Sequence, residues 1–298
     1  MKILILGASG FIGNAAFDYF SKQNETTGVD KVNLGRKEIF LDSDFSLTKR
    51  LIIESKYDFI INCAGSSDVK DSFINTEKDF IVNVNFVQNV LSVLKSNSPQ
   101  TKFINLSSAA VYGNPSTLPI NENEIINPIS PYGFHKFLSE QLISEYSKLF
   151  NLGTLSVRIF SAYGNGLKRQ LLFDLYSKFN TNPESICLFG TGSESRDFIF
   201  ITDIINAIEI LISNASFKGE VYNLASGEES FINKTALLFA SICNYNGEII
   251  FQNSQIQGYP INWKADITKL KSLGFSPQVS LKDGLEEYFS WIDNNNHS

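Results

Sequence analysis

The sequence predicts a doubly wound α/β fold, a parallel sheet with helices on both faces, and a smaller interleaved lobe for substrate. Two observations predict it. Short apolar segments alternate with helix-length segments through the first 160 residues, as in βαβ units. A glycine-rich loop, Gly7–Gly13, directly follows the first apolar segment. In such folds this loop binds a dinucleotide.

Four apolar segments fit strands that are buried on both faces of a parallel sheet. They are Lys2–Leu6, Phe59–Asn62, Lys102–Leu106 and Thr154–Ile159. We expect helices between them at Phe11–Gln23, Leu47–Ser55, Lys78–Ser96 and Pro131–Phe150. Later short runs at Ile186–Phe189, Phe198–Ile201 and Val221–Leu224 lie among turns, Leu281–Trp291 is expected as a closing helix, and Asn294–Asn296 as a frayed tail.

This pattern suggests two parts that share the chain. We expect residues 1–160 to form the dinucleotide-binding domain, with parts of 197–225 woven back into it. Residues 161–196 and 226–298 are expected to form the substrate-binding lobe.

Composition narrows the class of protein. With 298 residues, 43% of them hydrophobic, the chain can bury a large core, and its net charge of −6 disfavours a protein that coats nucleic acid. Three distant cysteines and two histidines predict neither a disulfide framework nor a metal site. The first apolar run is too short for a signal peptide, and no run reaches the roughly 20 residues of a membrane helix. We therefore expect a cytoplasmic protein without membrane contact.

The glycines of the loop have separate expected tasks. Gly7 allows the tight turn, Gly10 allows close approach of a pyrophosphate, and Gly13 allows helix and strand to pack closely. Phe11 and Ile12 then open the helix whose N-terminus faces the phosphates. The alternative is an ordinary tight turn between strand and helix.

The residue after the second strand selects the cofactor, because an acid there binds a ribose 2′-hydroxyl and an arginine suits a 2′-phosphate. We place this strand at Lys31–Leu34, which puts Arg36 just beyond it and predicts NADP(H). If the strand is Thr26–Val29 instead, Asp30 follows it and the cofactor is NAD.

A serine, a tyrosine and a lysine form the candidate catalytic group. Ser108 follows a buried run, and Tyr132 and Lys136 lie four residues apart, on one face of a helix. A tyrosine transfers protons near neutral pH only if its pKa falls from about 10, and a cation one turn away lowers it. The alternative is an amphipathic surface helix.

These motifs together resemble the extended short-chain dehydrogenase/reductase family, the NAD-dependent epimerase/dehydratase group. The resemblance runs through nearly the whole chain. Its motifs, in order, are GASGFIG (Gly7–Gly13), NCAG (Asn62–Gly65), Asn83, SSAAVYG (Ser107–Gly113), YGFHK (Tyr132–Lys136), RDFIFITD (Arg196–Asp203) and YNLASG (Tyr222–Gly227).

The resemblance implies a role for each matching position. Ser108 would bind the reacting oxygen, Tyr132 would carry the proton and Lys136 would bind the nicotinamide ribose. Further cofactor contacts would be Asp44 and Phe45 at the adenine, and Cys63, Ala64, Gly65 and Asn83 along the pocket. It also implies a homodimer.

Substrate contacts are expected from Ser161 and Arg196. Arg196 would grip a nucleotide diphosphate together with the N–H groups of the turn Gly190–Ser193; the alternative is an ion pair with Asp197 or Glu194. His135 is expected to be a packing residue. Lys168–Arg169 faces either the nucleotide pocket or solvent.

Departures from the family's motifs narrow the activity. Dehydratases carry an Asp-Glu pair after the catalytic hydroxyl, where this chain has Ala109 and Ala110, so we expect no dehydratase. Ser161 replaces the family's asparagine, and Gln257–Pro260 lacks its second arginine. We expect an NADPH-dependent reductase of a nucleotide-linked 4-keto-6-deoxyhexose. The alternatives are a nucleotide-sugar 4-epimerase that retains NAD and a dinucleotide-binding redox sensor without activity.

Overall fold

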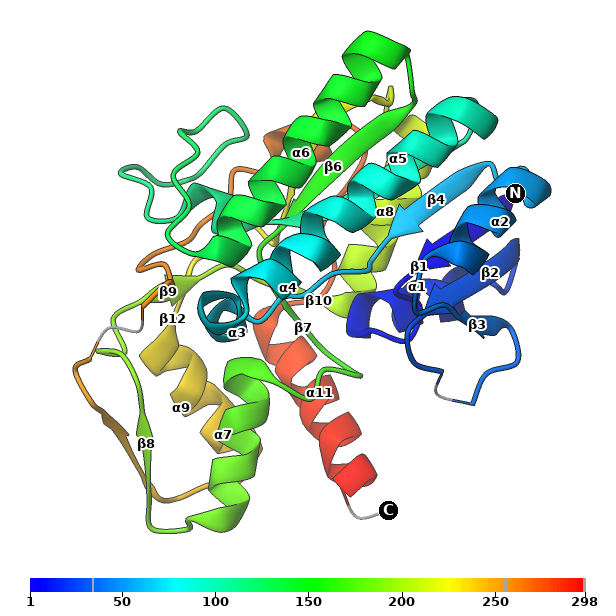
Figure 1. The fold of residues 1–298 in the computed structure, drawn as a ribbon. Helices are drawn as coiled ribbons and strands as arrows, with labels where there is room; N and C mark the ends of the chain where they lie inside the picture. Colours follow the sequence, from blue (N-terminus) through cyan, green and yellow to red (C-terminus); the bar gives the residue numbers. More distant parts are fainter. Residues whose placement is uncertain (34, 255–256, 297–298) are drawn as a thin grey trace.

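A seven-stranded sheet runs through the molecule (Figure 1). The computed structural model describes residues 1–33, 35–254 and 257–296. The strand order is β11-β6-β5-β4-β1-β2-β3, and every pairing is parallel. The strands are β1 (Lys2–Leu6), β2 (Glu25–Asp30), β3 (Ile39–Leu41), β4 (Phe59–Asn62), β5 (Lys102–Ser108), β6 (Thr154–Ile159) and β11 (Lys218–Leu224). The doubly wound fold is therefore confirmed.

Alternating side chains of β1 enter two separate cores. Ile3 and Ile5 pack under α1 and α8, whereas Leu4 and Leu6 pack under α2, α5 and α6. The helices are α1 (Phe11–Phe20), α8 (Ile201–Asn214), α2 (Ser46–Ser55), α5 (Phe86–Asn97) and α6 (Pro131–Phe150). Because side chains alternate along a strand, an unbroken apolar strand needs cover on both faces.

The helix expected at Lys78–Ser96 consists of three joined pieces. After the short α3 (Val69–Ile74) come α4 (Thr76–Phe80), a π-helical turn η1 (Ile81–Asn85) and then α5. Such π-helical turns are rare and often lie at functional sites. This one carries Asn83, a predicted cofactor contact.

Most of the remaining elements form a smaller lobe, which extends to the lower left of Figure 1. The further strands pair as β10 (Phe198–Phe200) with β7 (Ser161–Tyr163), β12 (Ser230–Phe231) with β9 (Ser195–Arg196), and β13 (Glu248–Phe251) with β8 (Ser185–Leu188). The helices here are α7 (Gln170–Thr181), α9 (Ile232–Ile242) and α11 (Leu281–Asn296). In contrast, α10 (Thr268–Lys271) packs against β11 of the main sheet, and η2 (Ala109–Tyr112) is a 3₁₀ turn after β5.

Two expected elements are wrong. The second strand is Glu25–Asp30, and residues 31–33, expected as a strand, form a bend and a loop; Leu34 lies outside the described residues. The expected frayed tail instead continues α11, which we expected to end at Trp291. None of the helices in the described ranges is long and apolar enough to cross a membrane. Nor do those ranges contain three His, Cys, Asp or Glu side chains grouped to hold a metal ion.

A buried ion pair joins α6 to the sheet. The guanidinium of Arg158 on β6 donates to both carboxylate oxygens of Glu140 on α6, at 2.7–3.2 Å. Ser107 Oγ also donates to Glu140, at 2.6 Å, and Arg158 donates to the Tyr112 hydroxyl. Although burial disfavours the charge of Arg158, its bonds to Glu140 raise its pKa above the usual value. The pair thereby fixes α6 against β5 and β6.

We predict that Arg158→Ala lowers the free energy of unfolding by about 3–5 kcal/mol, because it leaves the buried Glu140 carboxylate without its counter-charge. Urea denaturation measures this change. Lys178→Ala is the matched control, since it breaks a more exposed pair with Asp174 at 2.9 Å and is expected to cost about 1 kcal/mol or less. Similar losses in both variants would contradict the prediction.

Candidate active site

The glycine loop is shaped by close backbone packing. Gly7 has a φ of +76°, and a Cβ added there would lie 2.6 Å from the Ala64 nitrogen. A Cβ at Gly13 would lie 2.0 Å from the Gly7 oxygen, so neither position accepts a side chain. A Cβ on Gly10 would meet one atom, at 3.3 Å. Among the described residues no side chain caps α1, which begins at Phe11. Its free N–H groups and this open approach fit a dinucleotide's diphosphate.

Asp30 ends β2 beside this loop. Its Oδ2 accepts a hydrogen bond from the Ser9 nitrogen at 2.8 Å, and its Oδ1 accepts one from the Lys31 nitrogen at 2.6 Å. A carboxylate at this place binds a bare ribose diol and repels a 2′-phosphate. The alternative strand assignment, with Asp30 at its end, is thus confirmed.

Arg36 is engaged elsewhere. Its guanidinium forms an ion pair with Asp18 on α1, including a hydrogen bond of 3.2 Å from Nη2, and lies 5.8 Å from the ring centroid of Phe17. The bond to Asp18 raises the pKa of Arg36. The expectation that Arg36 binds a 2′-phosphate therefore loses its basis, because its charge is already balanced on the outside of α1.

The predicted cofactor pocket contains buried polar atoms without partners. Asn83 is 1% exposed, and neither its Nδ2 nor its Oδ1 has a hydrogen-bond partner among the described residues. Asn83 Oδ1 and Lys136 Nζ flank Gly65, at 2.6 and 3.2 Å from the place of an added Cβ. Beside them burial raises the pKa of Cys63 to about 12, so its thiol stays protonated. Unpaired buried amide atoms fit a polar ligand here.

Ser108 and Tyr132 meet where α6 begins. Ser130 caps α6 by accepting from the Gly133 nitrogen at 3.1 Å, and Pro131 occupies the first turn. A Cβ at Gly133 would lie 2.6 Å from the Ala110 oxygen, so the glycine lets α6 approach the end of β5. Ser108 Oγ accepts from the Ala110 nitrogen at 3.2 Å and hydrogen-bonds the Tyr132 side chain.

The Tyr132 hydroxyl is protonated in the free protein. Burial raises the pKa of Tyr132 to about 12, the bond to Ser108 and the charge of Arg169 oppose this, and the charge of Asp79 adds to it. Lys136 Nζ instead donates to the Leu106 oxygen at 2.9 Å and lies 5.9 Å from the Tyr132 ring centroid. The expected lowering by Lys136 is therefore wrong for this state, because its ammonium points elsewhere.

Arg196 lies in a half-buried site without a carboxylate partner among the described residues. Its Nη1 donates to the backbone oxygens of Ser195 at 2.7 Å and Ile261 at 3.0 Å, and the guanidinium lies 5.7 Å from the Trp263 ring centroid. Burial lowers the pKa of Arg196 to about 10, still cationic at neutral pH. An incompletely balanced cation of this kind favours an anionic ligand.

The neighbouring acids do not neutralise Arg196. Asp197 accepts bonds of 2.7–3.2 Å from Ser226, Gly227 and Ala265 instead. Glu194 accepts bonds of 2.9–3.1 Å from the nitrogens of Thr191 and Gly192. Two N–H groups of the turn at 190–193 thus bind Glu194, so the prediction that this turn binds an anion is wrong.

Other predicted contacts occupy varied positions. Ser161 begins β7, where its nitrogen donates to the Asp197 oxygen at 2.9 Å. Asp44 accepts from the Ser46 nitrogen at 3.1 Å, and Phe45, with a φ of +71°, packs edge-on against Phe86 at the start of α2. Their roles stay predictions.

Lys168 and Arg169, expected to face either the nucleotide pocket or solvent, have different surroundings. Lys168 Nζ lies 5.9 Å from the Trp291 ring centroid. Arg169 lies near enough to Tyr132 for its charge to lower that residue's pKa.

Sequence reasoning missed Asp79. It lies four residues before Asn83, and the helical spacing alone would have placed both on one face. It also missed Trp263, which no motif marks. His135 is buried as expected, but it also contacts Asp79 at 2.6 Å.

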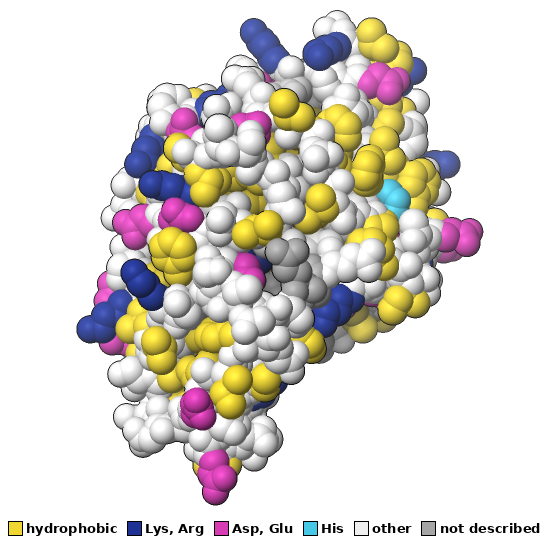
Figure 2. Space-filling model, turned by 90° about the vertical axis from the view of Figure 1, so that its left-hand side faces the viewer, with side chains coloured by type: hydrophobic (Ala, Val, Ile, Leu, Met, Phe, Trp, Pro, Cys, Tyr) yellow, Lys and Arg dark blue, Asp and Glu magenta, His cyan; other side chains and the backbone are white. Residues whose placement is uncertain are grey.

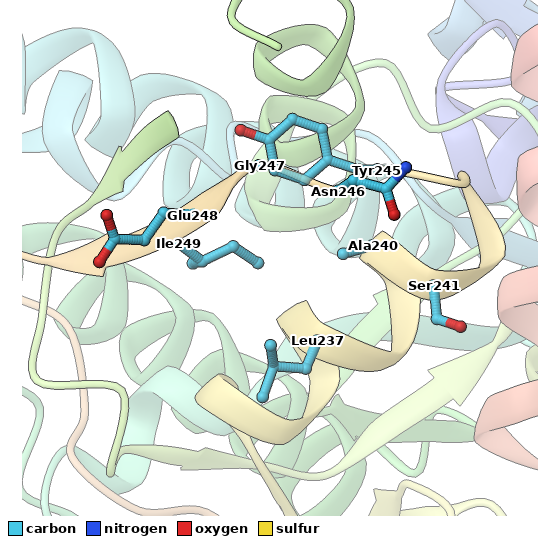
Figure 3. Close-up of a pocket in the computed structure, with 8 residues that line it drawn as sticks. All are labelled: Leu237, Ala240, Ser241, Tyr245, Asn246, Gly247, Glu248 and Ile249. Carbon is cyan, nitrogen blue, oxygen red and sulfur yellow. The ribbon is translucent and has the colours of Figure 1, made fainter. Parts of the chain in front are cut away.

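A separate hollow lies between α9 and β13 (Figure 3). It is lined by Leu237, Ala240, Ser241, Tyr245, Asn246, Gly247, Glu248 and Ile249. None of the predicted catalytic or cofactor residues belongs to it, so it plays no part in the chemistry described here.

The parallel sheet, the glycine loop and the Ser-Tyr-Lys group define a dinucleotide-dependent enzyme of the extended short-chain dehydrogenase/reductase class. Residues 3–225 match the model of the NAD dependent epimerase/dehydratase family, and the chain belongs to that family.

Comparison with known proteins points to nucleotide sugars. An uncharacterized UDP-glucose epimerase of Bacillus subtilis is 28% identical over 98% of each chain. A dTDP-D-glucose 4,6-dehydratase of Dictyostelium discoideum is 26% identical over 99% of this chain and 82% of its own. A UDP-glucuronic acid 4-epimerase of Bacillus cereus, solved with UDP-glucuronic acid and NAD, is 27% identical with a TM-score of 0.90, covering 99% of this chain and 100% of its own.

We predict that Asp30→Ala weakens NADH binding by roughly 1–3 kcal/mol, the range for a lost charge-assisted hydrogen bond. Fluorescence titration with NADH measures it. Arg36→Ala is the control and is expected to keep NADH affinity within about twofold of the wild-type value, because the Arg36 guanidinium is paired with Asp18. A loss of NADPH affinity in Arg36→Ala that spares NADH, together with unchanged NADH affinity in Asp30→Ala, would restore the earlier assignment.

Proposed function

We propose that the protein is a nucleotide-sugar 4-epimerase that retains NAD. The observation that carries this proposal is the position of Asp30 at the end of β2, which suits NAD and disfavours NADP(H). The reductase that we expected from the sequence depended on Arg36 and is less well supported. The relatives named for UDP-sugar epimerisation support the same choice.

The dehydratase activity of one relative is not proposed for this chain. A dehydratase needs an acid beside the reacting sugar to remove water. Ala109 and Ala110 follow Ser108 directly, and both are buried in η2. Neither can donate a proton.

The residues of the chain supply proton transfer and orientation. Tyr132, ionised beside the positive charge of a bound oxidised cofactor, would take the proton of the sugar's C4 hydroxyl and later return it, while Ser108 would donate a hydrogen bond to the same oxygen. Lys136 holds the cofactor's ribose. A nicotinamide cofactor held there would supply reversible hydride transfer at C4 of the sugar. The cycle has no net redox change, so it consumes no second substrate.

We also infer that two chains pair through α6 and the neighbouring α3 and η1. Large hydrophobic side chains are exposed there: Ile74 (80%), Ile81 (46%), Phe134 (53%) and Leu138 (40%). Figure 2 shows hydrophobic side chains at several places on the surface of one side of the molecule. Burying the group on α3, η1 and α6 against a second copy would remove it from water, which the mass in solution tests.

We predict that the protein interconverts UDP-glucose or UDP-glucuronic acid with its 4-epimer without added cofactor. Tyr132→Phe is expected to slow this at least about 100-fold, because the proton carrier is lost. Chromatography of the two epimers measures the rate. Tyr245→Phe is the control, since its hydroxyl donates to the Asn182 oxygen in the small lobe. Turnover only with NADPH would favour the reductase.

We further predict that UDP alone raises the melting temperature, because a ligand of the folded state stabilises it. Arg196→Ala should abolish this shift and keep the shift that NADH induces, since the guanidinium is the cation offered to the diphosphate. Arg50→Ala, which removes an exposed arginine on α2, is the control. If millimolar UDP and other nucleoside diphosphates leave wild-type melting unchanged, the nucleotide-sugar assignment fails.

A further inference from the structure

A buried polar contact between α4 and α6 lies outside the mechanism above. Asp79 is 2% exposed and His135 is 7% exposed, and Asp79 Oδ1 lies 2.6 Å from His135 Nδ1. The His135 ring packs edge-on against Phe80, with centroids 5.4 Å apart. His135 directly precedes Lys136 on α6, and the charge of Asp79 acts on both Tyr132 and Lys136.

The second oxygen of Asp79 is left without a partner. Asp79 Oδ2 has no hydrogen bond among the described residues, and neither amide atom of Asn83, one turn further along, has one. A buried carboxylate with an unsatisfied oxygen costs free energy unless a nearby opposite charge offsets it. A role in joining two helices does not require this charge, because a neutral amide would make the same contact.

Among the described residues, Lys136 is the buried cation near Asp79 that no carboxylate binds directly. Lys136 is 7% exposed, and its ammonium donates to a neutral acceptor, the Leu106 oxygen. Glu140, the other buried carboxylate nearby, is already bound by Arg158. Burial lowers the pKa of Lys136 to about 8; the charge of Asp79 is the first to oppose this, and the charge of Glu140 also opposes it.

We propose that Asp79 is a positioning residue for Lys136: its carboxylate, fixed by His135 across the helix pair, keeps the lysine protonated inside the buried site. The proposal deepens the proposed function but depends only on Lys136 holding the cofactor, whichever sugar the enzyme takes.

The test follows NADH binding by fluorescence across the alkaline pH range. Wild-type affinity should fall as Lys136 loses its proton, and Lys136→Met should lack this transition. Asp79→Asn keeps the shape and removes the charge, so the midpoint should move to lower pH by about one unit. Glu77→Gln makes the same charge change at an exposed position of α4 and should leave the midpoint unchanged. His135→Gln keeps the carboxylate and should also leave it unchanged.

Several results would overturn the proposal. They are an unmoved midpoint in Asp79→Asn, an equal shift in Glu77→Gln, a shift to lower pH in His135→Gln, and an alkaline transition that persists in Lys136→Met. If Asp79→Asn does not fold, the double variant Asp79→Asn/His135→Gln replaces it under the same criterion. Failure of that variant to fold assigns the pair to structure alone. A protein that binds NADH as expected but epimerises no sugar would refute the proposed function and leave this inference standing.

Discussion

The bidentate ion pair between Arg158 and Glu140 is the interaction on which the geometry of the site depends. Glu140 lies one helical turn after Lys136, and it also accepts from Ser107, which directly precedes Ser108. The pair therefore fixes how far α6 lies along β5. A slip of α6 would separate Tyr132 from Ser108. A buried pair gives such fixation only when both partners are present, since either charge alone is strongly destabilising.

The sequence predicts the parts of this fold in which burial is complete. β1, β4 and β6 are buried along nearly their whole length, and their predicted bounds agree with the structure. β2 reads Glu-Thr-Thr-Gly-Val-Asp and is only partly buried, because its outer neighbour β3 has three residues. Because the strand was placed by hydrophobicity, we expected it at the more apolar stretch that follows, Lys31–Leu34. Backbone pairing with β1 determines the strand instead, from Lys2 with Glu25 to Leu6 with Val29.

Side-chain competition explains the other errors about the site. Residue types alone suggested that the turn at 190–193 offers N–H groups to a ligand, but Glu194 accepts two of them. Acids and hydroxyls close in sequence often satisfy the backbone in this way. Likewise Arg36 forms an ion pair with Asp18, eighteen residues earlier in the chain. Such partners are set by tertiary packing, which spacing along one chain does not reveal, whereas the glycine spacing at 7, 10 and 13, directly after a buried strand, is visible in the sequence itself.

Burial shifts the pKa values of the tyrosine and the lysine of the site in opposite directions. It raises the pKa of Tyr132 and lowers that of Lys136, so in the free protein each group is pushed toward its neutral form. An ionised Tyr132 would then need a positive charge placed next to it. The oxidised nicotinamide carries such a charge, and its reduced form does not. Tyr132 would therefore ionise beside the oxidised cofactor and hold a proton beside the reduced one, so that proton uptake by the tyrosine would accompany hydride transfer to the cofactor.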